Sequence, residues 1–255
     1  MLLRRITKHV KDQNWFAVGI DFVIVVIGVF IGIQVANWND ARSDRQLGQE
    51  YTQRLILDLE QDLAGTRSLK DYYAQVLVSV QEADRLLAEP GSDNQALVVA
   101  AYRASEYNDN PPNTATWDEI VSSGHLKLLP TDAVKDGLGS YYKFRKRVAD
   151  SAEIRTSEYR KTVRSLIPLT VQLAIRKGCS DIYDELNVAS GFVSDCQIDL
   201  NDGVLMDVAE ALRASDAVKE SLRHHYSLVA FMQINNDGDI AGAENALALL
   251  MQIAS

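Results

Sequence analysis

Asp21 is the ionisable residue whose setting is most unusual, because every other residue from Trp15 to Trp38 is uncharged. A carboxyl group among apolar residues is costly in lipid, so it needs a partner, a proton or water. Gly28 and Gly32 lie on the same face of a helix as Asp21, at about 100° per residue. Two glycines at this spacing let another helix approach closely.

We therefore expect the face formed by Asp21, Gly28 and Gly32 to associate with a second copy of the chain or with another membrane protein. Two alternatives remain open. Asp21 could lie shallow enough to draw in headgroup water, with the glycines playing no special part. A ring of Asp21 side chains could also form a proton or ion path, although no second ionisable group lies deeper in the segment.

Cys179 and Cys196 are the two cysteines of the chain, and the loop between them is short and rich in turn-forming residues. Outside the cytoplasm such a pair can persist as a disulfide, and closing a loop of this length stabilises by roughly 3 kcal/mol in the chain-entropy model. No histidine lies near either cysteine and the C-x-x-C spacing is absent, so a metal site is not expected. The alternative is two unpaired thiols.

Sequence signatures of phosphate-binding loops, nucleophile elbows, dinucleotide-binding turns and zinc proteases are all absent. Of the four histidines, His125 follows Gly124, where a capping or packing role is expected, and the adjacent His224 and His225 point to different sides of a helix. Asp58 and Asp62 share a helix face, and we expect that face to be solvated. The sequence therefore predicts no enzyme, no cofactor and no metal.

The segment from Gln233 to Glu244 follows the spacing of a calcium-binding EF-hand loop, with Gly238 at position 6. Position 1 is Gln233, however, where the ion needs a carboxylate. The run from Asn235 to Gly238 is also a common way to end a helix. We expect a plain turn here, and calcium binding is the alternative.

Residues 15–38 form an apolar stretch that is long enough for a transmembrane helix, which needs about 20 apolar residues. Trp15 and Trp38 stand at its ends, where aromatic rings prefer the membrane interface. Residues 1–14 carry a net charge of +3, whereas the basic residues after Trp38 alternate with acidic ones. The positive-inside bias predicts a cytoplasmic N-terminus and an exterior domain. A cleaved signal peptide is the alternative, but it has a shorter apolar core and a small-residue cleavage site.

The formal net charge of the 255-residue chain is -9, so residues 15–255 carry -12. An acidic exterior domain argues against nucleic acid as a partner, and its simplest role is solubility. Membrane lipid is an expected partner because of the apolar stretch.

Helical spacing of apolar residues predicts an all-α fold. Apolar residues recur every three or four positions from Tyr51 to Leu87, and no proline precedes Pro90. The transmembrane helix is therefore expected to continue into a stalk. We predict a cytoplasmic tail (1–14), a transmembrane helix (15–38), a stalk helix (39–89) and a periplasmic helical domain (90–255).

Within the last region the sequence predicts helices over about 94–107, from Trp117 to Gly124, 131–167, 204–234 and 241–253. Residues 108–114 and 178–203 are expected to be irregular, and evidence for strands is thin. Pro168 is expected to kink or break the chain.

Two stretches carry a family resemblance. Residues 19–63 combine Asp21, Gly28, Gln34 and the Asn37-Trp38-Asn39 run at fixed offsets, followed by a "Y---L--DL--D" pattern, and residues 116–142 contain an "SG-L-L" run and a Tyr141-Tyr142 pair. Both are similar to a family of uncharacterised bacterial single-span membrane proteins. The resemblance implies a single span and a helical exterior domain, and it implies no activity.

We expect a non-enzymatic scaffold or interaction subunit of a bacterial inner membrane that assembles through its span and stalk. An envelope sensory or regulatory protein is the first alternative; its periplasmic bundle would bind a ligand and signal through a partner. An envelope enzyme is the second alternative. A deep pocket with buried polar clusters would favour either alternative over the scaffold.

Overall fold

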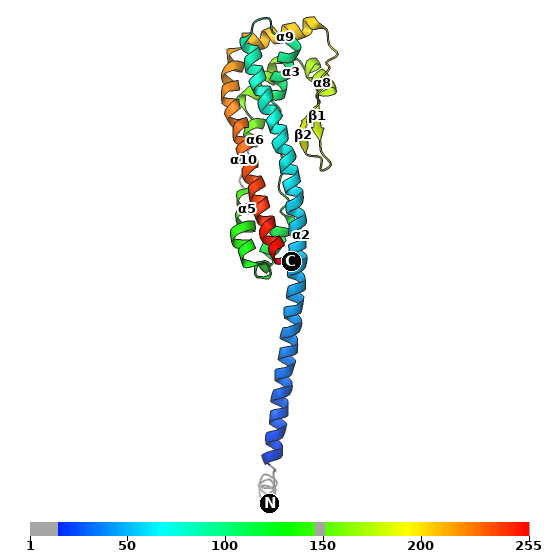
Figure 1. The fold of residues 1–255 in the computed structure, drawn as a ribbon, viewed down its shortest axis with the longest axis vertical. Helices are drawn as coiled ribbons and strands as arrows, with labels where there is room; N and C mark the ends of the chain where they lie inside the picture. The colour runs from blue at the N-terminus through cyan, green and yellow to red at the C-terminus, as the bar shows by residue number, and fades with distance from the viewer. Residues whose placement is uncertain (1–14, 146–150, 255) are drawn as a thin grey trace, which may run out of the picture. The chain divides into compact units, whose positions relative to one another are not determined.

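The computed structural model describes residues 15–145 and 151–254, so the predicted cytoplasmic tail lies outside the described residues. The described chain is all-α, as the sequence predicts, with one small two-stranded sheet (Figure 1). Its helices are α2 (Trp15–Ala88), α3 (Asn94–Ala104), α4 (Ala115–Ser122), the 3-10 helix η1 (His125–Leu128), the π-helical turn η2 (Ala133–Leu138), α5 (Gly139–Arg145), α6 (Ser151–Arg155), α7 (Glu158–Leu166), α8 (Leu169–Gly178), α9 (Asp202–Ala214) and α10 (Asp216–Ala254).

The chain divides into two compact units, residues 1–50 and 51–255, and helix α2 contributes to both. In the first unit the large apolar side chains from Ile20 to Trp38 are exposed. Among the described residues, α2 is the one helix that is long and apolar enough to cross a membrane. The helix runs without interruption because no proline occurs before Pro90, and it ends where Gly91 adopts a positive φ of 79°.

The second unit is built around the C-terminal part of α2 and the buried helix α3. The apolar positions that repeat every three or four residues along α2, among them Leu55, Leu59 and Tyr73, are fully buried. Asp93 caps α3 by accepting a hydrogen bond from the backbone N–H of Ala96 at 3.0 Å. Helices α7, α9 and α10 complete one core cluster with these two helices. This core positions the loop ends that form the candidate site.

The predicted single helix over 131–167 is wrong. The structure instead has η2, α5, α6 and α7, and Ser157 begins α7 by accepting a hydrogen bond from the backbone N–H of Arg160. Pro168 does break the chain and serves as the N-cap position of α8. Several short helices can each turn their apolar side chains toward the common core, whereas one straight helix of that length would extend beyond it.

The predicted turn over Asn235–Gly238 is also wrong, because α10 is continuous from Asp216 to Ala254. Tertiary contacts hold this weakly helix-forming run in place. Asn236 is buried, the Gln233 amide donates to the Lys70 carbonyl at 3.0 Å, and Asp237 pairs with Lys70 at 2.5 Å. The EF-hand-like loop is therefore a helix in the structure, and a helix cannot wrap its side chains around calcium as that loop does.

Residues 178–203 are mostly irregular, as predicted, but contain an antiparallel hairpin of β1 (Asp181–Tyr183) and β2 (Ala189–Phe192), which the sequence did not predict. Asp184 forms the turn by accepting hydrogen bonds from the backbone N–H groups of Leu186 and Val188. The Gln75 side chain of α2 accepts from the N–H of Phe192 at 2.9 Å, so β2 is fixed to α2. As a result, β1 of the hairpin and the end of α3 line the same pocket.

Candidate functional site

The Cys179–Cys196 disulfide predicted from the sequence is confirmed, with a Cα–Cα distance of 4.6 Å. It joins the C-terminal end of α8 to the segment that leads into α9. Together with the hairpin it holds residues 178–203, which have little regular structure of their own, against the helical core. Cys179 of the disulfide also lines a pocket of the domain.

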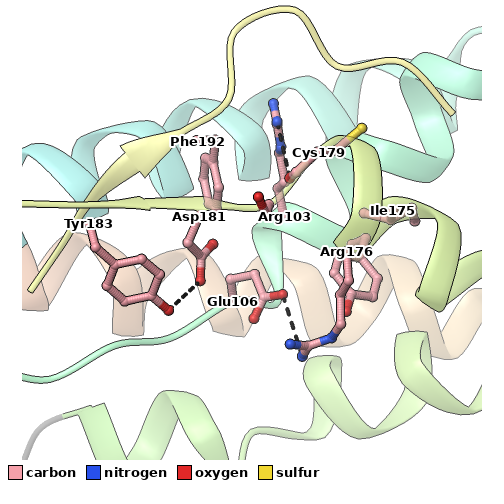
Figure 2. A pocket seen from close by; sticks show the side chains of 10 residues that line it. Arg103, Glu106, Ile175, Arg176, Cys179, Asp181, Tyr183 and Phe192 are labelled. Carbon is pink, nitrogen blue, oxygen red and sulfur yellow. Dashed lines mark hydrogen bonds and ion pairs between the residues drawn. The ribbon is translucent and has the colours of Figure 1, made fainter. Parts of the chain in front are cut away.

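This pocket has a volume of about 230 Å³ and lies between the end of α3, the end of α8 and the hairpin (Figure 2). Its lining includes the apolar groups of Ile175, Cys179 and Phe192. It also carries charges of both signs, from Asp181 and Glu106 and from Arg103 and Arg176. The lining residues are Tyr102, Arg103, Glu106, Ile175, Arg176, Cys179, Ser180, Asp181, Tyr183 and Phe192.

Glu106 is the buried anion of the pocket, with a side chain that is 10 % exposed. Arg164 of α7 contacts its carboxylate at 2.8 Å and Arg160 contacts it at 3.5 Å. Arg176 is the third cation, at 4.0 Å, and its side chain is 60 % exposed. Two arginines behind the pocket therefore balance Glu106. The charge of Arg176 is available at the pocket surface.

Asp181 lies at the start of β1, next to Glu106 in the pocket (Figure 2). The pKa of its carboxyl group is raised from 3.8 to about 6, mainly by burial and also by the negative charge of Glu106, whereas Arg176 and the hydroxyls of Tyr183 and Tyr72 lower it. The Tyr183 hydroxyl donates to Asp181 only at 3.5 Å. The carboxylate is therefore desolvated without a close ion pair of its own within the described chain.

Arg103 fastens the pocket to the helical core. Its guanidinium donates to the carbonyl oxygens of Val193 at 2.7 Å and Cys179 at 3.3 Å, and it lies over the ring of Phe192 at 4.8 Å. Burial lowers the pKa of this guanidinium, which stays charged at neutral pH. Its role is to position the hairpin and the disulfide relative to α3.

The arrangement can recognise charge of both signs at once, with Asp181 and Arg176 facing the same small cavity. Sequence reasoning missed this site because its residues come from four separate elements and form no motif. The raised pKa of Asp181 depends on its burial in the fold and then on the charge of Glu106, which lies 75 positions earlier in the chain. The one signal available in the sequence was the disulfide, which brings residues 178–203 onto the core.

A second polar cluster surrounds Asp62, and here the expectation of a solvated surface is wrong. Asp62 is 4 % exposed and accepts hydrogen bonds from the backbone N–H of Asn113 and from the hydroxyl of Tyr141, both at 2.9 Å. Burial raises the pKa of its carboxyl group. Asp58 accepts from the Asn113 amide at 2.7 Å. The two aspartates therefore hold the proline-containing loop at residues 108–114 and the tyrosine pair of α5 against α2.

Tyr51 makes a similar connection nearer the N-terminal end of α2. Its hydroxyl donates to Glu119 at 3.2 Å and lies 3.0 Å from Nδ1 of His125, and Arg54 pairs with Glu119 at 2.7 Å. The two stretches that carry the family resemblance are thus in direct contact, through Tyr51 at one point and Asp62 at another. Their shared polar residues hold the fold together.

The other residues considered for chemistry have packing or surface positions. His225 is fully buried, its Nε2 lies 2.8 Å from the Ala104 carbonyl, and burial lowers its pKa to about 4. His224 is exposed, as expected from its place next to His225. Among the described residues, no group of three or more His, Cys, Asp or Glu side chains is placed to hold a metal ion.

The proposed association face of α2 is open in the structure. A side chain added at Gly28 or Gly32 would meet no atom within 4 Å. Asp21 belongs to α2, but its side chain lies outside the described residues. No contact with any other part of the described chain is made at the two glycines.

Comparison with known proteins identifies the family. Residues 21–185, well over half of the chain, match a family of unknown function (DUF6090). The chain therefore belongs to this family, and the expectation of an uncharacterised family is confirmed. No curated protein and no solved structure matches the chain.

Proposed function

We propose that this member of the DUF6090 family is a single-span bacterial inner-membrane protein that acts as a non-enzymatic scaffold or interaction subunit. Its N-terminus would lie in the cytoplasm and its helical domain in the periplasm. The observation that carries the proposal is the first part of α2. There, thirteen large apolar side chains between Ile20 and Trp38 are 43–68 % exposed.

Leaving such a surface in water is unfavourable by an amount on the order of 10–20 kcal/mol, because fully burying one large apolar side chain is worth roughly 1.5–3 kcal/mol and these thirteen side chains are about half exposed. Insertion into lipid removes this cost, and a helix satisfies its own backbone hydrogen bonds there. The disulfide supports an oxidising compartment for the domain, since disulfides persist mainly outside the cytoplasm.

The orientation is tested with a reporter enzyme that is active only in the periplasm, fused after Ser255. We expect activity because of the basic residues before Trp15. A matched reporter that works only in the cytoplasm should be silent at the same position. The reverse pattern would reject both the orientation and the compartment.

Assembly is proposed to occur between copies of the chain along the face of Asp21, Gly28 and Gly32. The open space at both glycines supports this, since a second helix could pack directly on the backbone. Adjacent copies would also give each Asp21 a polar neighbour in the membrane. Native mass spectrometry of the full chain in mild detergent measures the oligomer.

Replacing Gly28 and Gly32 together by isoleucine should convert the oligomer to a monomer, because the added side chains prevent close approach. Phe30→Ile on the opposite face is the control and should leave the oligomer unchanged. A monomeric wild type, or an oligomer that survives the double substitution, would reject self-association along this face.

The pocket beside the disulfide favours a second candidate function, that of a sensory or regulatory protein whose domain binds a ligand. The supporting observation is the pair of opposite charges, Asp181 and Arg176, at a cavity of about 230 Å³. Such a protein would pass its signal to a partner. Binding of a small ligand by the full chain tests this candidate.

A further inference from the structure

We propose that the pocket between α3, α8 and the β1–β2 hairpin binds a small zwitterion of the α-amino acid class. The ligand carboxylate would pair with Arg176 and its ammonium group with Asp181. This inference rests on the second candidate function, ligand binding by the domain, and is independent of assembly through α2.

Arg176 is the cation of the pocket that a ligand can use. The nearest anion, Glu106, already has Arg164 at 2.8 Å and Arg160 at 3.5 Å, whereas Arg176 lies at 4.0 Å. A planar guanidinium suits a carboxylate, because two parallel N–H donors match its two oxygens. Since 60 % of the Arg176 side chain is exposed, it can turn toward a ligand without breaking a close ion pair.

Asp181 supplies the complementary anion. Its carboxyl group is desolvated and lies near the negative charge of Glu106, and burial outweighs the stabilisation of its charge by Arg176 and by the hydroxyls of Tyr183, at 3.5 Å, and Tyr72. An ammonium group would replace the lost hydration with charge-assisted hydrogen bonds. The structure therefore holds a desolvated carboxylate whose charge a bound ammonium group would stabilise.

The size and the apolar lining of the pocket restrict the ligand further. A volume of about 230 Å³ is below the range of roughly 300–1,000 Å³ for pockets of drug-sized ligands, so the ligand has few heavy atoms. Ile175 and Phe192 give the cavity an apolar side that a small aliphatic side chain can contact. A small amino acid fits all three features.

Ligands with a single charge fit less well. A simple carboxylate would be repelled by Asp181 and Glu106, and a simple amine would bring Arg176 no carboxylate closer than Glu106 at 4.0 Å. Comparing the amino acid with the amine and the carboxylic acid that share its side chain therefore separates recognition of a zwitterion from attraction to one charge.

The experiment uses the full chain in mild detergent, with each of the twenty standard amino acids added in turn at millimolar concentration. A ligand at about ten times its Kd should raise the Tm by roughly 3–6 °C for a domain of about 200 residues. The affinity of the strongest binder is then measured by calorimetry beside the amine and the carboxylic acid that share its side chain. We expect each analogue to bind at least tenfold more weakly.

Two variants test the assigned contacts. Arg176→Gln and Asp181→Asn should each weaken binding of the amino acid at least tenfold. Arg67→Gln is the control, because Arg67 is an exposed arginine that pairs with Glu244 away from the pocket, and it should bind normally. The Asp181→Asn chain should remain folded, since the substitution removes a desolvated charge.

If no amino acid raises the Tm, the zwitterion site is rejected. If the amine or the carboxylate binds as tightly as the amino acid, ligand binding by the domain stands but the assignment of the zwitterion is overturned. Unchanged affinity in the Arg176 and Asp181 variants would place the ligand elsewhere. None of these results affects the oligomer measured by native mass spectrometry.

Discussion

Asp62 offers the sharpest test of the fold, because a residue expected at the surface is buried at the centre of a polar cluster. In Asp62→Ala, the backbone N–H of Asn113 and the hydroxyl of Tyr141 lose their acceptor. Each orphaned buried group costs about 1–3 kcal/mol. The variant also relieves the burial cost that raises the pKa of Asp62. We therefore expect a net loss of about 2–4 kcal/mol in the free energy of unfolding.

Urea unfolding of the full chain in mild detergent, followed by circular dichroism, measures this loss. Glu60→Ala is the matched control, since Glu60 is an exposed acidic residue on the same helix, and it should change stability by no more than about 0.5 kcal/mol. In a double-mutant cycle, Asp62→Ala and Tyr141→Phe should couple by about 1 kcal/mol or more. If Asp62→Ala costs no more than the Glu60 control, or if the cycle is additive, the buried cluster is refuted.

Three further predictions concern the pocket, the disulfide and α10. The pKa of Asp181 is about 6 in the folded chain against 3.8 for a free carboxyl group, so its charge opposes folding above pH 6 and this penalty disappears as the pH falls toward 4. After a discount for partial exposure, Asp181→Asn should raise the free energy of unfolding by about 1–2 kcal/mol at pH 7 and by almost nothing at pH 4. A lower urea midpoint for the variant at pH 7 would contradict this. Replacing Cys179 and Cys196 together by serine should cost roughly 3 kcal/mol in the same assay, and equal stability with and without reductant in the wild type would show that the bond contributes little. Gly238→Ala should stabilise by about 0.5–1 kcal/mol, because Gly238 lies inside α10 with open space at its Cβ position, whereas a loss would indicate the turn that the sequence suggested.

The features that the sequence predicts correctly are those with a local physical cause. Helix α2 follows from apolar spacing and from the absence of proline before Pro90, and its end follows from Pro90 and Gly91. The exposed apolar surface of residues 20–38 follows from composition alone. The cysteine pair could be joined because the loop between Cys179 and Cys196 is short.

The features that the sequence predicts wrongly depend on partners that are distant along the chain. Asn235–Gly238 has the composition of a turn, yet contacts of this segment with Lys70 on α2 keep it helical. Asp62 has the spacing of a surface carboxylate, yet Tyr141 and the loop at Asn113 cover it. In each case the energy of a long-range contact exceeds a local preference of a few tenths to about one kcal/mol.

The candidate site was decided by tertiary structure alone. Arg176 and Asp181 are ordinary charged residues in the sequence, and nothing in their spacing distinguishes them from the other charged residues of an acidic chain. Their properties arise because Arg160 and Arg164 of α7 pair with Glu106, which leaves Arg176 without a close ion pair beside a desolvated carboxylate at the same cavity. A local sequence pattern determines which segments become helices, but desolvation and charge pairing depend on neighbours that only the folded chain brings together.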